Sequence, residues 1–350
     1  MTIEQALRTY DFEKSVLVGY YGGGNYGDEL LLEILANKLQ ARGIKHVTIA
    51  YQNPRTYTTF HHDFGYPRIA MYNRRQLLRT VLKNKTIVVG GGGLWGLDVN
   101  PNILLLSMLL FCSRWLLRKR VYMLGVGYYN STSRIGNLSA WLAGKSATHI
   151  IARDSETYQN FRAVTKHVSQ DTDLAWLIPA LDLQPYEQDS ARLMALLPVN
   201  RKTIFITLRR FRPNQKNTYL EAVEGYLASN QETDIILALM EPQDVDAEGY
   251  RLIRSWQKAY KNIRITDFSC NPLALYLFFR EHQNKLAFIG PQFHMIITAY
   301  LNHVPYLPVA YDNKVLSLFQ QIGQKRVIPI RTLSTSDLQA FAGKFMEGRR

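Results

Sequence analysis

The sequence predicts an α/β protein with two domains, and three observations support this fold class. The chain has 350 residues, of which 47% are hydrophobic and 20% are charged, which is enough for two domains that each bury a core. Short apolar runs alternate with segments of helical periodicity in both halves of the chain, as strands alternate with helices. Glycine-rich loops follow two of these runs. We therefore expect residues 1–185 and 198–330 to form two α/β domains.

The first glycine-rich loop follows an apolar run at Ser15 to Tyr20. It reads Gly22-Gly23-Gly24-Asn25-Tyr26-Gly27-Asp28-Glu29 and leads into leucines and isoleucines at helical spacing. A strand, a glycine loop and a helix make the first unit of a Rossmann-like domain. The spacing matches neither the Walker pattern nor G-x-G-x-x-G with a downstream acid. A loop that binds a ligand and a plain tight turn are therefore both open.

The second glycine-rich loop, Gly90-Gly91-Gly92-Gly93, follows an expected strand at Thr86 to Val89. Four consecutive glycines have a large entropic cost in folding, so a plain turn explains them poorly. Ligands of open α/β sheets gather at the carboxyl ends of the strands. We expect both glycine loops to lie at that edge.

The remaining elements alternate in the same manner. In the first half we expect strands at His46 to Tyr51, Val121 to Val126 and His149 to Ala152, and a linker with Pro185 and Pro198 at Leu181 to Val199. In the second half we expect strands at Thr203 to Leu208, Asp234 to Met240, Asn262 to Thr266 and Leu286 to Ile289. The helices expected there are Asn217 to Leu227, Tyr250 to Tyr260, Pro272 to Arg280 and Met295 to Leu301. The segment 331–350 holds a final amphipathic helix, Thr335 to Met346, and crossing back to the first domain is one way to bury its apolar face.

Two groups in the second half suit catalysis. His294 follows Gly290-Pro291 where a turn becomes a helix, and helix starts favour bound anions. Imidazole titrates near neutrality and can pass a proton to a substrate; a buried histidine under a crossover helix is the alternative. Arg209-Arg210-Phe211-Arg212 ends an apolar run and is a candidate clamp for carboxylate or phosphate.

The charge of the chain is uneven. Its net charge is +14, and between Phe64 and Arg153 there are 13 basic residues and one acidic residue, Asp98. This half should face an anion, for which nucleic acid, an anionic membrane and a phosphate-bearing substrate are candidates. No nucleic-acid motif is present. The apolar stretch Ile103 to Cys112 is too short to span a bilayer, which takes about 20 residues. It is followed by Trp115 and four basic residues, which predicts either a helix on an anionic membrane surface or a core helix with a solvated basic end.

The cysteines and the amino terminus indicate the compartment. Cys112 and Cys270 fit no metal-ligand spacing, so we expect a reducing cytoplasm rather than a disulfide framework. The first residues lack the apolar core of a signal peptide. His61-His62-Asp63 invites a metal site, but no partner motif stands near, and a solvated loop fits better. The predicted location is cytoplasmic, at the inner face of the plasma membrane if the apolar helix binds there.

Several separated motifs resemble those of the polysaccharide pyruvyl transferases, in the same order. They are the two glycine loops, Gly125-Val126-Gly127, Ala152-Arg153-Asp154-Ser155-Glu156, Asp173-Leu174-Ala175, Arg209, and the stretch Gly290 to Lys314. The similarity spans about Val16 to Gly323. It implies two Rossmann-like domains facing a cleft, similar to the B-type glycosyltransferase fold.

The resemblance also implies an activity. Members of the family transfer the enolpyruvyl carbons of phosphoenolpyruvate onto two sugar hydroxyls, without a metal or another cofactor. By carry-over His294 is the general acid and Arg209 binds the donor, and the donor side includes Arg210, Gln292, Phe293 and Lys314. The acceptor, a sugar or a lipid-linked oligosaccharide, would meet Gly23, Gly24, Asn25, Gly27, Asp28, Gly91, Gly92, Gly93 and Trp95. Trp95, with Tyr128 and Tyr129, would stack on a sugar ring, unless these aromatic residues belong to the core.

One departure from the family keeps other functions open. The family usually has Arg-Leu-His where this chain has Gln292-Phe293-His294, and glutamine donates hydrogen bonds without a charge. A B-type glycosyltransferase with a nucleotide-sugar donor should have a carboxylate near the start of a second-domain helix, but no acidic residue follows His294 before Asp312. A catalytically silent glycan-binding relative is the other alternative. The sequence predicts no oligomeric state.

Overall fold

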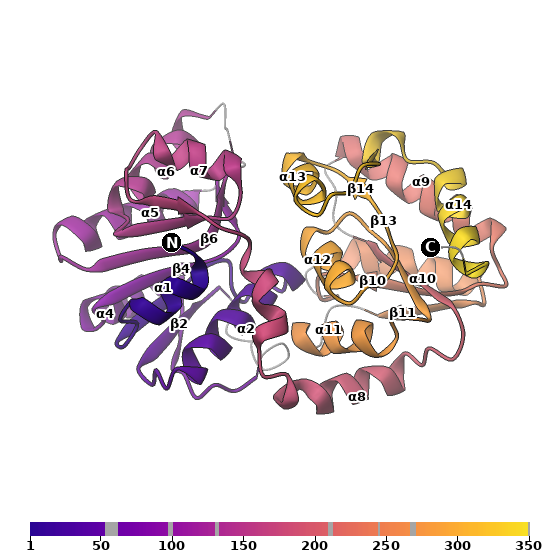
Figure 1. The fold of residues 1–350 in the computed structure, drawn as a ribbon, viewed down its shortest axis with the longest axis horizontal. Coiled ribbons are helices and arrows are strands. Elements are labelled where there is room, and N and C mark those ends of the chain that lie inside the picture. Colours follow the sequence, from indigo (N-terminus) through magenta and orange to yellow (C-terminus); the bar gives the residue numbers. More distant parts are fainter. Residues whose placement is uncertain are drawn as a thin grey trace. The chain divides into compact units, whose positions relative to one another are not determined.

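The computed structural model describes residues 1–52, 62–96, 101–129, 133–208, 213–243, 246–266 and 271–348, with the side chains of 213–217 left aside. The chain divides into two compact units (Figure 1). The first comprises Met1–Gly23 and Asp28–Asp182, and the second comprises Gly24–Gly27 and Leu183–Arg350. The main division thus falls three residues before the expected end of the first domain at 185.

The first unit is built on a parallel sheet. Its strand order is β3 (Arg68–Ala70), β2 (Val47–Tyr51), β1 (Ser15–Val18), β4 (Thr86–Gly90), β6 (Arg120–Tyr128), β7 (His149–Ala152) and β8 (Val168–Gln170), with β5 (Gly93–Trp95) beside β6. The order changes direction between β1 and β4, the neighbours that precede the two glycine loops. Such a switch point is where ligands of open α/β sheets bind, at the carboxyl ends of the strands.

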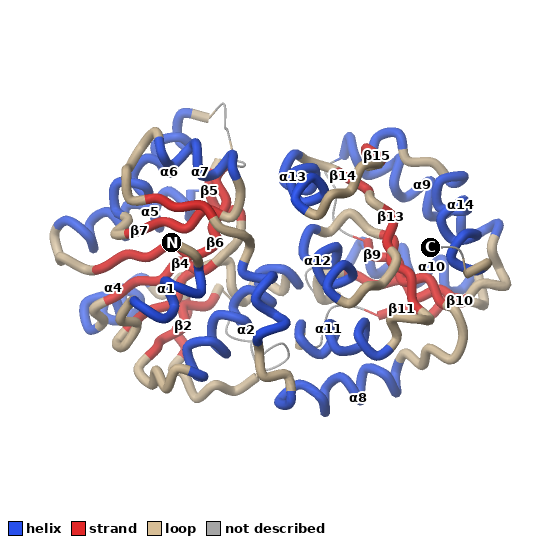
Figure 2. Tube along the Cα trace, in the orientation of Figure 1, coloured by secondary structure: helices blue, strands red, loops and turns tan. Residues whose placement is uncertain are grey.

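Helices complete the first unit (Figure 2). They are α1 (Ile3–Thr9), α2 (Tyr26–Ala41), α4 (Arg74–Lys83), α5 (Pro101–Trp115), α6 (Arg134–Ser146) and α7 (Ser155–Arg162), with a 3₁₀ helix at Leu174–Ala180. Buried residues of β1, β4, β6, β7, α5 and α6 share one hydrophobic core. α5 and α6 lie against each other, because the Ser107 and Ser139 hydroxyl oxygens are 2.9 Å apart and the Phe111 ring stacks on Trp141.

The second unit repeats this topology. Its parallel sheet has the order β11 (Ile263–Thr266), β10 (Asp234–Leu239), β9 (Thr203–Leu208), β12 (Leu286–Ile289) and β13 (Tyr306–Leu307), and β14 (Val309–Ala310) pairs with β15 (Ile328–Pro329). The order changes direction between β9 and β12. The segments after these two strands carry Arg209 and His294, respectively.

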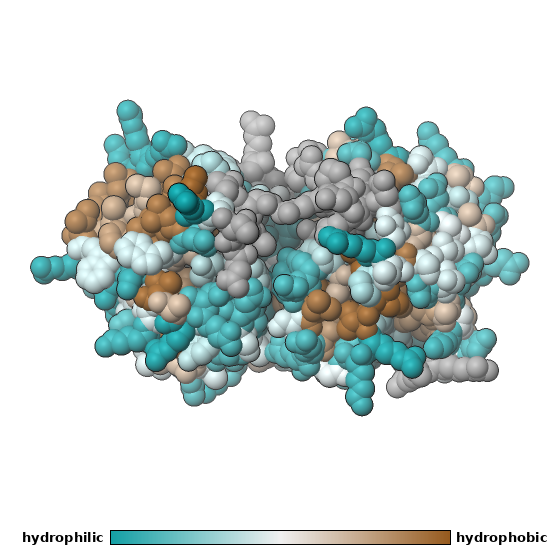
Figure 3. Space-filling view, turned by 90° about the horizontal axis from the view of Figure 1, so that it is seen from above, coloured by the Kyte–Doolittle hydropathy of each residue, from teal (hydrophilic) through white to brown (hydrophobic). Residues whose placement is uncertain are grey.

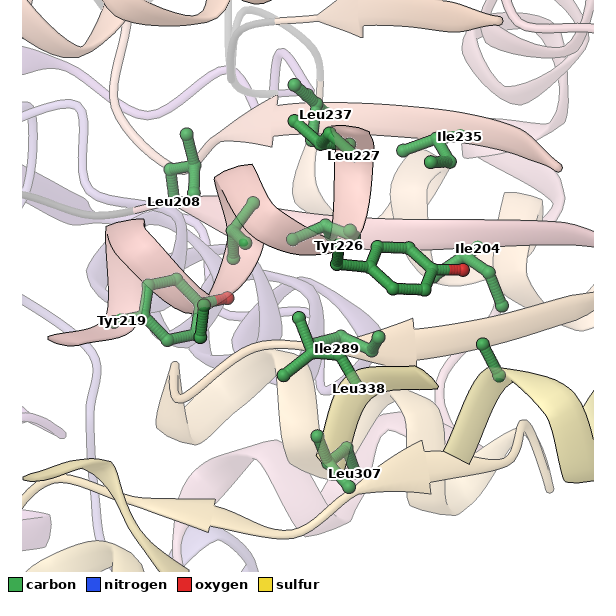
Figure 4. Close-up of a cluster of buried hydrophobic side chains, with 14 of the residues drawn as sticks. Ile204, Leu208, Tyr219, Tyr226, Leu227, Ile235, Leu237, Ile289, Leu307 and Leu338 are labelled. Carbon is green, nitrogen blue, oxygen red and sulfur yellow. The ribbon is translucent and has the colours of Figure 1, made fainter. Parts of the chain in front are cut away.

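The helices of the second unit are α8 (Glu187–Leu196), α9 (Pro213–Ser229), α10 (Ala247–Ala259), α11 (Pro272–Glu281), α12 (Phe293–Leu301), α13 (Asn313–Gln321) and α14 (Thr335–Met346), with 3₁₀ turns at Gln184–Tyr186 and Ile330–Thr332. Figure 4 shows part of the core, in which Tyr219 and Tyr226 of α9 lie among aliphatic residues of the sheet and Leu338 of α14. Every residue of β9 and β12 is buried, as expected for central parallel strands.

Two sequence-based expectations need correction. The expected linker Leu181 to Val199 contains α8, which packs on α11 and belongs to the second unit. The final helix α14, for which a return to the first domain was one expectation, packs on α9 and belongs to the second unit, because Leu338, Ala342 and Phe345 bury their side chains in the second core. The α/β class and the parallel sheets are as predicted.

Candidate active site

His294 lies at the carboxyl edge of the second sheet. The buried strand β12 ends at Ile289, and Gly290-Pro291 turns the chain into α12, whose first residue is Phe293. His294 is therefore the second residue of this helix, which begins two residues before the expected start at Met295. The Phe293 ring meets the His294 imidazole edge-on at 5.1 Å. The first N–H groups of a helix have no partner within it, so they favour an anion at this place.

The neighbouring strand β9 orients Gln292. β9 and β12 pair in parallel with Ile206 beside Ile289, which brings Thr207 to the residues that follow β12. The Thr207 hydroxyl donates a hydrogen bond to the side-chain oxygen of Gln292. Because that oxygen is engaged, the amide N–H₂ is held as a donor. Its nitrogen is buried and has no hydrogen-bond partner among the described residues.

A piece of the first glycine loop belongs to the second unit. Gly24–Gly27 groups with it because the Tyr26 backbone N–H donates to the Met240 carbonyl (3.1 Å) and the Tyr26 hydroxyl lies 2.8 Å from the Thr298 hydroxyl of α12. A Cβ on Gly27 would overlap the imidazole of His294. Only glycine allows this approach, which the sequence alone did not indicate.

The carboxyl edge of the first sheet collects the two glycine loops. The Tyr21 hydroxyl after β1 donates to the Gly90 carbonyl at the end of β4 (2.6 Å), and burial raises the pKa of this phenol. Gly92 has φ +81°, and a Cβ there would lie 3.1 Å from a carboxylate oxygen of Asp28. Positive φ and close approach both favour glycine. The structure thus brings together the expected loop residues around Asp28 and Gly92.

A buried ionic network lies at the same edge. Arg153 directly follows β7, is 5% exposed, and donates to Asp173 (3.0 Å) and to the Tyr129 hydroxyl (2.6 Å). Tyr129 in turn donates to Asp154 (3.1 Å). Burial would lower the pKa of Arg153, but Tyr129 and Asp173 more than offset it, so the pKa is raised. The sequence analysis named Arg153 only as part of a motif shared with the family. Its position as a charged residue directly after a buried strand is the sequence feature that could have indicated its role.

Other expected site residues lie elsewhere. Trp95 is 1% exposed, donates to the Ser107 hydroxyl and meets Phe161 edge-on. It therefore belongs to the core, and of the two roles that the sequence allowed, stacking on a sugar is the wrong one. Tyr128 and Tyr129 are buried too. Lys314 lies 3.3 Å from Asp312 and over the Tyr311 ring, and the described contacts do not join it to His294. Arg209 and Arg210, like His61 and Cys270, lie outside the described residues.

Metal ligands are not grouped in the described part of the chain: no cluster of three or more His, Cys, Asp or Glu residues there could hold a metal ion. Asp63 instead pairs with Arg68 (3.0 Å) and His62 packs edge-on against Phe64. The described helices also include none with the length and hydrophobicity to cross a bilayer.

Solved structures with similar folds include several UDP-GlcNAc 2-epimerases. A UDP-GlcNAc 2-epimerase from Neisseria meningitidis bound to UDP-GlcNAc has 11% identity and a TM-score of 0.63, with 95% of this chain and 91% of that chain covered. Epimerases from Methanocaldococcus jannaschii (13% identity, TM-score 0.63, coverage 95% and 92%) and Rickettsia bellii (10%, 0.61, 97% and 89%) are similar. At such identities the likeness shows the fold, which is the two-unit Rossmann-like architecture of B-type glycosyltransferases.

The family is shown by sequence. No curated protein matches this chain, but the model of the family described as polysaccharide pyruvyl transferase matches residues 25–313. This range contains most of both sheets, the second glycine loop and His294. The chain belongs to the polysaccharide pyruvyl transferase family.

Proposed function

We propose that this protein transfers pyruvate from phosphoenolpyruvate onto two hydroxyls of a sugar, in a polysaccharide or its lipid-linked precursor, and forms a pyruvate ketal. Membership of the family supports the reaction class. The observation that carries the proposal is the placement of His294 at the start of α12, against Gly27 and two residues after the oriented Gln292. A proton donor and hydrogen-bond donors for an anion thus meet at one sheet edge.

The reaction needs both kinds of group. A proton added to the methylene carbon of phosphoenolpyruvate leaves a cationic carbon that carries the carboxylate and the phosphate. One sugar hydroxyl attacks this carbon, phosphate departs, and the second hydroxyl attacks to close the ketal. Of the two protons that the hydroxyls lose, one restores the acid and the other leaves with phosphate. General acid catalysis of this kind contributes about 10²- to 10⁴-fold.

His294 is the proposed general acid. Its place in the first turn of α12 puts it beside backbone N–H groups that favour the donor's phosphate or carboxylate. The approach to Gly27 fixes where the ring lies. In this proposal the imidazole gives its proton to the methylene carbon and regains one from the attacking hydroxyl.

We expect Gln292 and the arginines to bind the phosphate and carboxylate of the donor. The Gln292 amide nitrogen points its donors away from Thr207, which holds the oxygen. Arg209 and Arg210 follow Leu208, the last residue of β9, and are the expected charged partners of phosphate or carboxylate. Phe293 and Lys314 are further donor-side candidates from the family resemblance. The reaction as proposed uses phosphoenolpyruvate as co-substrate and no other cofactor.

The acceptor is proposed to meet the glycine loops. Gly23, Asp28 and the Gly91–Gly93 run belong to the first unit, and Gly24, Asn25 and Gly27 to the second. Asp28 starts the part of α2 that belongs to the first unit, and its carboxylate can accept a hydrogen bond from a sugar hydroxyl. The Asn25 side chain already accepts from the Gly27 N–H (3.1 Å), so it shapes the loop.

The test is an assay of the purified protein with phosphoenolpyruvate and a panel of free and lipid-diphosphate-linked sugars. Released phosphate and the mass of the sugar product are both followed. We expect sugar-dependent phosphate release together with a ketal product. Phosphate release without a ketal product would overturn ketal formation. No release with any sugar, while a nucleotide sugar is turned over, would overturn the proposal in favour of a glycosyltransferase. Gln292→Arg shows whether the family's arginine improves use of the donor.

A further inference from the structure

The outer face of α5 and α6 exposes a continuous set of apolar side chains. Most of these residues are more than two-fifths exposed: Leu105, Met108, Trp115 and Leu116 at α5, and Ile135, Leu138 and Trp141 on α6. The opposite face of α5 is buried in the core through Leu106 and Leu110. α5 is therefore neither wholly a core helix nor a solvated one.

The two helices hold this face together. Ser107 contacts Ser139, the Phe111 ring stacks on Trp141, and the Trp115 indole N–H donates to the Lys145 carbonyl (3.2 Å). These three links join α5 and α6 at successive points along the two helices. We call the surface formed by their exposed apolar residues the α5–α6 face. Figure 3 shows hydrophobic side chains gathered on the first unit, at the left of the view, with hydrophilic side chains around them. Patches of this kind usually mark an interaction site.

Basic residues border the α5–α6 face, and its helices carry no acidic residue. Arg134 starts α6, Lys145 lies in its last turn, and both are exposed. Arg114 lies 6.0 Å from the centre of the Trp115 ring. Two of the four basic residues after Cys112 are held within the protein instead: Lys119 donates to the Leu82 and Asn84 carbonyls and Arg120 pairs with Asp11. The charge that faces outward therefore comes from both helices.

We propose that the α5–α6 face docks the protein on an anionic lipid membrane. An apolar surface with a basic border matches a bilayer boundary, where apolar side chains enter the lipid and cations meet the headgroups. Each Lys or Arg near an anionic surface strengthens binding to it, which a protein partner without acidic groups would not do. Docking would bring the enzyme to lipid-linked acceptors, but it depends on neither phosphoenolpyruvate nor His294.

The experiment is sedimentation of the full chain with vesicles of phosphatidylcholine alone or mixed with phosphatidylglycerol. We expect binding to the anionic vesicles that weakens as salt rises. Leu116→Glu with Leu138→Glu should weaken this binding by at least about tenfold, since the exposed leucines lose contact with water when they enter the lipid. Arg134→Gln with Lys145→Gln should weaken it roughly 30-fold and reduce its salt dependence.

Matched controls come from the second unit. Leu196 of α8 is as exposed as Leu116, 76% in each case, so Leu196→Glu should bind like the wild type, as should Arg251→Gln with Lys258→Gln on α10. Thermal melting shows that the variants fold. Brominated lipid tails should quench tryptophan fluorescence of the wild type, and Trp115→Phe with Trp141→Phe should remove most of that quenching.

Three results would overturn the proposal. If the wild-type protein does not bind anionic vesicles at low salt, the membrane is ruled out as the partner. If Leu116→Glu and Leu196→Glu lose vesicle binding equally, the α5–α6 face is ruled out as the binding surface. A concentration-dependent dimer that Leu116→Glu converts to monomer, with no vesicle binding, would assign the face to a second copy of the chain. None of these results bears on pyruvyl transfer, which is measured without vesicles on a free sugar.

Discussion

The five strands of the second sheet repeat the order of five strands of the first, but the two sheets end in different kinds of polar groups. At the carboxyl edge of the first sheet, Arg153 donates to Tyr129 and Asp173, and Tyr129 donates to Asp154. At the edge of the second, Thr207 holds one end of Gln292 while the amide nitrogen has no partner among the described residues, and His294 lies at a helix start. A buried network whose charges are paired holds a shape, whereas an oriented donor beside a titratable group suits chemistry. Four substitutions test this contrast.

Arg153→Met should have the largest effect, and on stability. Removing one partner of a buried ion pair leaves Asp173 without its cation and costs about 3–5 kcal/mol. Denaturant unfolding measures the loss. Arg162→Met on the exposed side of α7 is the control and should change little. A stable Arg153→Met protein that has lost activity would instead place Arg153 in the chemistry.

Gly27→Ala should mainly lower activity. The added methyl would overlap the His294 ring, and a misplaced catalytic group can cost on the order of 100-fold in kcat/KM. Stability should fall by about 1–3 kcal/mol, as for other overpacked sites. Gly343→Ala is the matched control, because a Cβ there meets nothing within 4 Å. Full activity in Gly27→Ala would show that the approach to His294 does not matter.

Thr207→Val should weaken donor binding modestly. Without the hydroxyl, the Gln292 amide is free to rotate, and one hydrogen bond contributes about 0.5–1.5 kcal/mol. We expect the KM for phosphoenolpyruvate to rise by about three- to tenfold with little change in kcat. Thr203→Val removes a hydroxyl at the other end of β9, where it donates to the Arg201 carbonyl (2.9 Å), and should leave KM unchanged. Equal KM values for Thr207→Val and Thr203→Val would show that the orientation of Gln292 does not affect binding of the donor.

Asp234→Asn should have the smallest effect. Asp234 starts β10 at the amino edge and pairs with Arg201 (2.6 Å), and this hydrogen bond lowers the pKa of its carboxyl. A lowered pKa stabilises the fold above the carboxyl's ordinary pKa, and that contribution is lost as pH falls through the folded value. The wild type should therefore be slightly more stable than Asp234→Asn at pH 7, and the two should converge as the pH falls through the lowered pKa of the folded carboxyl. Activity at pH 7 should not differ.

Much of the fold was predictable because central parallel strands are continuous apolar runs. β7, β9 and β12 have the bounds that the sequence indicates, since each run stops at glycine, arginine or another polar residue. The three-residue strands β3, β5 and β8 are too short to show a period. α8 was taken for a linker because Pro185 and Pro198 flank it, and its packing on α11 is a tertiary effect that no local pattern carries.

In the candidate site, too, local features were predictable from the sequence and contacts between distant residues were not. His294 was predictable from its turn and helix, which are local. The link between Thr207 and Gln292 spans 85 positions and depends on β9 and β12 being neighbours, so only the folded sheet shows it. The close approach of Gly27 to His294 is also a contact between distant parts of the chain that only the folded structure shows. The sequence left the role of Trp95 open, because a tryptophan after a glycine loop suits both stacking on a sugar and packing in a core.

The most direct test of the central claim compares the wild type with His294→Gln in D₂O, with phosphoenolpyruvate and an accepted sugar. Glutamine keeps hydrogen bonds but donates no proton to carbon. The account predicts that the wild type forms a ketal with deuterium in its methyl group and that His294→Gln, folded to the same melting temperature, forms it at least about 100-fold more slowly. Deuterated ketal formed by His294→Gln at the wild-type rate would contradict the assignment of His294 as the acid.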